Sequence, residues 1–146
     1  MDTNGISVAL ELHTTIDDHG EAETNTTKQT GLLYQRENMD VLTFNESLED
    51  GSTVKNLMKI EPKKVSIKRT GPISMHQQFD VNRITENVFQ HPHGNLHMET
   101  TTTWIDYKPL SAQANGLLRM HYTVKLNGQD ERKHTLTLSL KEEAPR

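Results

Sequence analysis

Residues 6–16, ISVALELHTTI, alternate between two kinds of side chain, and this alternation decides the fold class. The even positions are apolar apart from Thr14, whereas the odd positions are small or polar. Successive side chains of a β-strand point to opposite faces, so a period of two predicts a strand with one buried face. The next four residues, DDHG at 17–20, favour a turn. The chain is therefore predicted to open on a strand that turns back.

The same period recurs to the end of the chain. It is clear in 95–105, 118–126 and 135–140, and the pair Asn127-Gly128 is typical of a hairpin turn. No segment of a dozen residues has apolar side chains spaced by three and four, so at most one short helical turn is expected, near 109–115. Further segments have the length of strands between breakers: 21–30, 32–36, 40–46, 53–60, 65–69, 73–79 and 84–90.

Closely spaced turns between short strands predict either a barrel or a sandwich. The chain has 42 large apolar residues, enough to fill one inner face but not to cover a second apolar surface. This balance favours a single closed antiparallel β-barrel of about eight to ten strands with a polar outside, and closure also removes free sheet edges. Residues 1–146 are expected to form one domain. A sandwich remains the alternative.

Composition limits the cellular setting. No apolar run approaches the roughly 18 residues of a membrane helix, and none follows Met1 as in a secretory signal. With no cysteine, disulfides, thiolate metal sites and a cysteine nucleophile are excluded. We therefore expect a cytoplasmic protein without membrane contact.

Charge is unevenly distributed along the sequence. Residues 1–50 hold 11 acids against Lys28 and Arg36, whereas the excess of basic residues lies between Lys55 and Arg69. One interpretation is that acidic and basic strands lie side by side and neutralise each other. The other is a basic stripe that binds phosphate or nucleic acid. Few aromatic residues and a pI near 6.0 argue against nucleic acid, so no such partner is expected.

One stretch carries information beyond its periodicity: residues 68–104, KRTGPISMHQQFDVNRITENVFQHPHGNLHMETTTTW. Together with Tyr122 on a later strand, this stretch resembles the YwiB-like family of small bacterial proteins of unknown function. The matching residues are Arg69-x-Gly71, Met75-x-Gln77-x-Phe79, Pro92-x-Gly94-x-Leu96-x-Met98 and Thr100-x-Thr102. The resemblance spans essentially the whole chain and implies an eight-stranded, calycin-like barrel related to the lipocalins. It supplies no reaction and no cofactor.

Arg69 and Gln77 share a predicted face with apolar or small residues. A buried guanidinium must be paired or reach solvent. Arg69 and Gln77 could therefore bind a carboxylate or other polar head group inside the barrel. Alternatively, Arg69 closes one end of the barrel through an internal acid or through backbone carbonyls. Replacement of Arg69 by Met would separate the two, because only a structural plug costs several kcal/mol when removed.

The leading functional hypothesis is a barrel that binds a small, partly apolar ligand with a polar or acidic head group, by analogy with the fold. Six residues are expected to line its interior: Arg69, Met75, Gln77, Met98, Trp104 and Tyr122. The alternative is a structural or regulatory protein that uses the barrel wall for a homodimer or another protein contact. An enzyme is the third class, but the sequence contains no nucleophile elbow, zinc-protease motif or glycine-rich phosphate loop.

His91, His93 and His97 surround a predicted Pro-Gly turn. Imidazole is a frequent metal ligand, and a hairpin brings such positions together. Only three ligands are local, however, and His97 falls on the polar face of its strand. We therefore expect an exposed hairpin and no metal or other cofactor.

Overall fold

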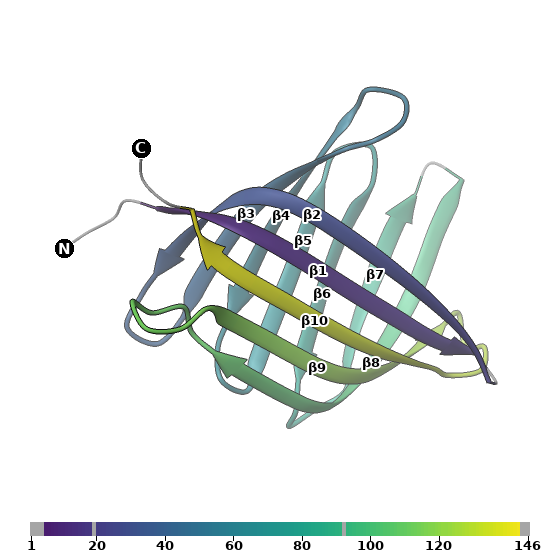
Figure 1. The fold of residues 1–146 in the computed structure, drawn as a ribbon. Helices are drawn as coiled ribbons and strands as arrows, with labels where there is room; N and C mark the ends of the chain where they lie inside the picture. Colours follow the sequence, from purple (N-terminus) through teal and green to yellow (C-terminus); the bar gives the residue numbers. More distant parts are fainter. Residues whose placement is uncertain (1–4, 19, 92, 144–146) are drawn as a thin grey trace.

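The computed structural model describes residues 5–18, 20–91 and 93–143, with the side chains of Asp18 and His91 outside the description. These residues form ten antiparallel strands that close into a barrel in chain order (Figure 1). The strands are β1 (Ile6–Asp18), β2 (Glu21–Gln35), β3 (Asp40–Ser47), β4 (Thr53–Ile60), β5 (Lys64–Thr70), β6 (Ser74–Asp80), β7 (Thr85–His91), β8 (Gly94–Lys108), β9 (Gly116–Leu126) and β10 (Arg132–Glu142).

Pairing of the first strand with the last closes the barrel. Leu10 lies opposite Leu140 in the register of β1 and β10, and Leu12 lies opposite Leu138. The predicted antiparallel barrel of eight to ten strands is therefore confirmed, with ten strands. The eight strands implied by the family resemblance are too few, because residues 53–91 divide into four strands of seven or eight residues.

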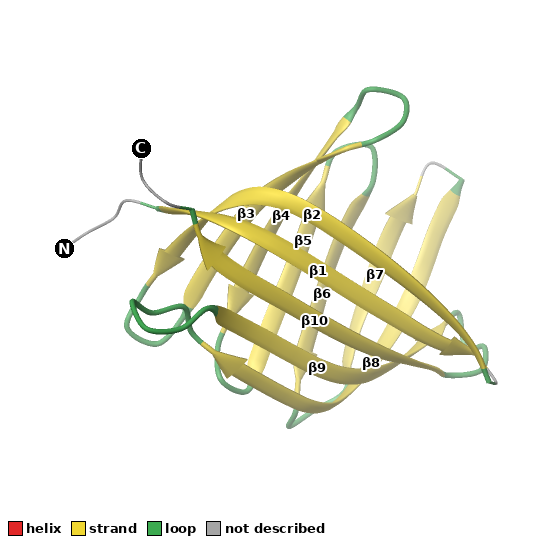
Figure 2. Ribbon diagram, viewed as in Figure 1, coloured by secondary structure: helices red, strands yellow, loops and turns green. Residues whose placement is uncertain are grey.

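The described residues contain no helix, as Figure 2 shows, and hence none that could cross a membrane. Residues 109–115, where a helical turn was allowed, form a loop in which the Ser111 hydroxyl accepts hydrogen bonds from the backbone N–H groups of Gln113 and Ala114. The Asn127-Gly128 turn forms as predicted: both residues have the positive φ that a type I′ turn requires.

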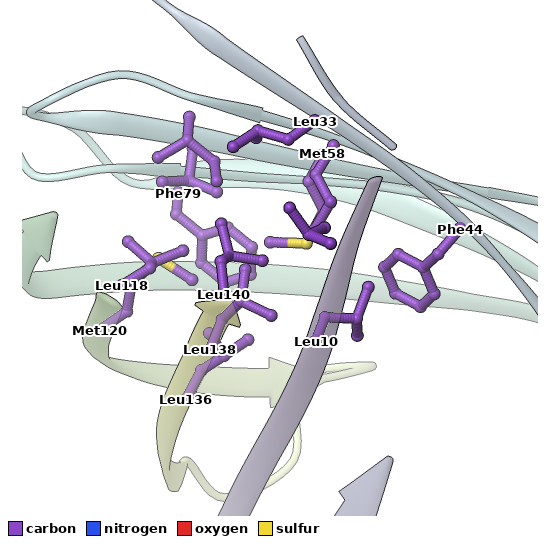
Figure 3. Packing of buried hydrophobic residues seen from close by; sticks show 14 of the residues in the cluster. Leu10, Leu33, Phe44, Met58, Phe79, Leu118, Met120, Leu136, Leu138 and Leu140 are labelled. Carbon is purple, nitrogen blue, oxygen red and sulfur yellow. The ribbon is translucent and has the colours of Figure 1, made fainter. Parts of the chain in front are cut away.

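The apolar members of each alternating strand meet in one interior. Figure 3 shows Leu10, Phe79, Met120 and Leu138 packed together, although they come from four different strands. Phe79 also contacts the ring of Tyr122 edge-on, with centroids 4.6 Å apart. Burial of these side chains is the main favourable contribution to folding.

A β-bulge in β8 corrects the expected position of Trp104. The register with β9 shifts between Thr102 and Trp104, so Trp104 pairs with His121 and points outward with 38% of its surface exposed. Its ring packs against His121 at 4.8 Å and lies under the Arg119 guanidinium at 5.3 Å. Strict alternation predicted an inward Trp104, but one extra residue in a strand reverses the parity after it.

The side-chain parity of β3 also corrects the expected charge pairing. The two acids of β3, Asp40 and Glu46, lie on its inward face, so the strand presents neutral side chains to the lysines of β4. Lys55 lies opposite Asn45, and Lys59 lies opposite Val41. The lysines of β4 therefore have no acid opposite them on β3, whereas Glu46 pairs with Arg69 of the basic segment on the inward face.

Candidate functional site

A cavity of about 230 Å³ opens at the end of the barrel where β1 ends and β10 begins. Its wall is mainly apolar and comes from β6 to β9, with Phe89 and Leu96 at the β7–β8 hairpin. Polar side chains of the β9–β10 turn and of β10 lie beside it, among them Gln129, Arg132 and His134. Apolar walls with a few polar groups are typical of small-molecule sites.

Four of the six predicted site residues line this cavity: Met75, Gln77, Met98 and Tyr122. They come from β6, β8 and β9 and meet because each occupies an inward position of its strand. Arg69 and Trp104 do not line it. Trp104 lies on the outer face because of the bulge, so its predicted position inside the barrel is wrong.

Tyr122 is the most informative residue of the wall. Only 7% of it is exposed, and its hydroxyl has no hydrogen-bond partner among the described residues. Burial raises the pKa of Tyr122 to about 12, so the hydroxyl stays protonated near neutral pH and can donate. Among the described side-chain atoms it is Thr102 Oγ1, and not the Tyr122 hydroxyl, that is buried without a partner, so the Tyr122 hydroxyl is not sealed from solvent. A ligand in the cavity could therefore accept a hydrogen bond from the Tyr122 hydroxyl.

His134 was missed by the sequence analysis. Its ring stacks on Tyr122 with centroids 5.0 Å apart and lines the cavity. Burial, and then the positive charge of Arg132, lower the pKa of His134 to about 4, so the imidazole is neutral at pH 7. A signal was present, because His134 continues the inward even positions of Leu136 and Leu138.

Gln77 on β6 is held in place by a hydrogen bond to Thr100 on β8, two strands away in the sheet. Its Nε2 donates to the hydroxyl of Thr100 at 3.1 Å, and only 8% of the residue is exposed. That bond uses the amide nitrogen and leaves the carbonyl oxygen available as an acceptor. The cavity wall thus combines a hydroxyl donor, an amide acceptor and a neutral imidazole.

Arg69 lies in a separate polar cluster inside the barrel. Its Nε donates to Asn56 Oδ1 and its guanidinium also reaches Glu46 Oε1, both at 3.2 Å. Asn56 donates to the same Glu46 oxygen at 2.9 Å. Arg69 therefore has the internal acid that its structural interpretation required, and its ligand-binding role stays a prediction without support from the cavity.

The three histidines do not form a described metal site. His93 and His97 are exposed, while the side chain of His91 and all of Pro92 lie outside the described residues. His97 Nε2 lies 3.8 Å from Glu86. Over the part of the chain that the structure describes, no three metal-ligating side chains gather.

Fold and site together define a small, closed ten-stranded β-barrel with a partly open interior cavity. Residues 10–138 match the family described as Domain of unknown function (DUF1934), and the chain belongs to this family. It is 24% identical over 132 residues to the uncharacterized beta-barrel protein YwiB of Bacillus subtilis (strain 168), covering 90% of this chain and 91% of that one. The crystal structure of the ywiB protein from Bacillus subtilis superposes with a TM-score of 0.82 at 22% identity, covering 96% of this chain and 94% of that chain.

Proposed function

We propose that the protein binds a small, partly apolar molecule with a polar or acidic head group in the cavity beside Tyr122. The observation that carries the proposal is Tyr122, a buried residue in the wall of an apolar cavity whose hydroxyl has no hydrogen-bond partner among the described residues. A ligand that accepts a hydrogen bond from this hydroxyl would gain about 0.5–1.5 kcal/mol from it. Gln77 and His134 offer further polar contacts to the same head group.

The cavity volume limits the size of the ligand. A 150 Å³ apolar cavity holds benzene, so 230 Å³ suits a molecule of about ten non-hydrogen atoms. Suitable molecules are a single substituted ring or a medium-length acyl chain. The apolar body would pack against Met75 and Met98, whose flexible side chains adapt to different shapes.

The proposal is tested by titrating octanoate and 1-octanol into isotopically labelled protein and following backbone amide shifts. We expect saturable shifts at Met75, Met98 and Tyr122. Leu96→Trp should abolish these shifts because it fills the cavity from its wall. Val88→Trp is the matched control, since Val88 lies in the same β7–β8 hairpin as Leu96 but is 51% exposed on the outside. Equal binding by both variants, or shifts outside the cavity, would contradict the proposal.

The alternative role, a protein contact on the barrel wall, has weaker support. Among the described residues, the large apolar side chains that are exposed are Leu32, Ile84, Val88 and Trp104, which come from β2, the β6–β7 loop, β7 and β8. A docking surface usually concentrates such residues in one patch. The expected cytoplasmic location is part of the proposal, and fractionation of the host cells tests it.

A further inference from the structure

The two inward acids of β3 have different surroundings. Glu46 is paired with Arg69, as described above. Asp40 is buried, with 7% of its surface exposed, and its Oδ2 accepts a hydrogen bond from the Tyr107 hydroxyl at 2.6 Å. Within the described part of the chain, Asp40 forms no ion pair, and its Oδ1 accepts no hydrogen bond. One neutral hydroxyl is therefore its side-chain partner, while Oδ1 is open to solvent, since Thr102 Oγ1 is the described side-chain atom that is buried without a partner.

A carboxylate fixed in this position, with one oxygen open at the cleft, is a favourable partner for a cation. Burial of an ionised group costs several kcal/mol unless an opposite charge and hydrogen bonds compensate for the lost water. A single hydroxyl satisfies only one of the four lone-pair positions of a carboxylate. The basic residue nearest along the chain is Arg36, but its guanidinium lies over the Tyr34 ring, 5.9 Å from the centroid.

Asp40 lies at a cleft with room for such a cation. The cleft has a volume of about 440 Å³ and lies where β2, β4 and β8 end, at the opposite end of the barrel from the cavity beside Tyr122. Glu37 and Glu61 lie at it together with Asp40, and among the described residues Arg36 is the basic residue that lines it. Met39, Ile60 and Pro109 supply apolar surface. The cleft thus combines an excess of negative charge with an apolar wall.

We propose that this cleft binds a primary ammonium group carried on a short apolar body, with Asp40 Oδ1 accepting its hydrogen bond. An ammonium has three donors and supplies the positive charge that the carboxylate lacks. The apolar body packs against Met39, Ile60 and Pro109. This is a second site, independent of the ligand in the barrel interior.

The first test compares benzylammonium with benzyl alcohol on the wild-type protein, by amide shifts at neutral pH. The two probes share shape but differ in charge. We expect benzylammonium to produce saturable shifts at Asp40 and Ile60, and the alcohol to bind about ten- to a hundredfold more weakly, as a charge-assisted bond is lost. Equal binding of both probes, or shifts confined to other residues, would overturn the proposal.

The second test uses Asp40→Asn, which preserves shape and the ability to accept from Tyr107 but removes the charge. Binding of benzylammonium should weaken about ten- to a hundredfold. Glu49→Gln is the control, because it removes the same charge from an exposed turn outside the cleft and should leave binding unchanged. Unchanged binding in Asp40→Asn also overturns the proposal. Should this variant fail to fold, the comparison of amine and alcohol decides.

Discussion

Substitution of Tyr122 by Phe tests directly whether its hydroxyl is free for a ligand. In most proteins, removal of a buried tyrosine hydroxyl costs about 0.5–1.5 kcal/mol, the net value of its hydrogen bond. The Tyr122 hydroxyl has no such bond within the described residues, while the ring keeps its contacts with Phe79 and His134. Burial of an unpaired hydroxyl costs about 1–3 kcal/mol when no water reaches it. Because this hydroxyl faces a cavity, we expect a smaller effect, a gain of about 0–1 kcal/mol in the free energy of unfolding.

Tyr107→Phe provides the matched comparison. Its hydroxyl donates to the Asp40 carboxylate at 2.6 Å, and a hydrogen bond to a charged group contributes about 1.5–3 kcal/mol. The same chemical change should therefore destabilise the protein at Tyr107 and leave it unchanged or more stable at Tyr122. Urea unfolding followed by circular dichroism measures both, with equal m-values as the check that only stability has changed.

The ligand experiment completes this prediction. Tyr122→Phe should weaken binding of octanoate or 1-octanol about two- to tenfold, the loss expected for one hydrogen bond. A loss of stability in Tyr122→Phe as large as that in Tyr107→Phe would refute the reasoning, because the hydroxyl would then already be used by the protein itself.

Three further predictions follow from the same geometry. Arg69→Met should lower the free energy of unfolding by about 1–3 kcal/mol, less than for a fully buried ion pair because both partners are 25% exposed. The double variant Arg69→Met with Glu46→Leu should recover much of this loss of stability, as measured by urea unfolding. Because the pKa of His134 falls from 6.5 to about 4 on folding, its stabilising effect is complete above pH 6.5 and is lost as the pH falls from 6.5 to 4; His134→Gln should reduce this pH dependence of the urea midpoint. Emission of Trp104 should be quenched by acrylamide and stay unchanged when octanoate binds, whereas protection by octanoate would contradict its outward position.

The strand parity of this chain could be read from the sequence wherever a strand is regular. Met75, Gln77, Met98 and Tyr122 were placed on the inner face by counting alternate residues, and the cavity brings them together. The predicted inward position of Trp104 was wrong because nothing in the run of threonines before it marks the bulge. The bulge depends on how β8 and β9 curve against each other.

Polar residues inside the barrel were harder to predict. His134 could have been found by continuing the pattern of β10, but a histidine on an otherwise apolar face carried no evident role. Asp40 was hidden for another reason: its burial depends on β3 closing against β2 and β4, and its partner Tyr107 is 67 residues away along the chain. Contacts of this kind between distant segments are set by the closed topology and not by local periodicity.

Native mass spectrometry of the protein purified gently from its own cells tests the central claim most directly. The account predicts, besides the bare chain of 16.7 kDa, a species heavier by about 100–200 Da, the mass of roughly ten non-hydrogen atoms, which is absent from Leu96→Trp and retained by Val88→Trp. The bare chain alone under every gentle condition, or the same added mass in Leu96→Trp, would contradict it.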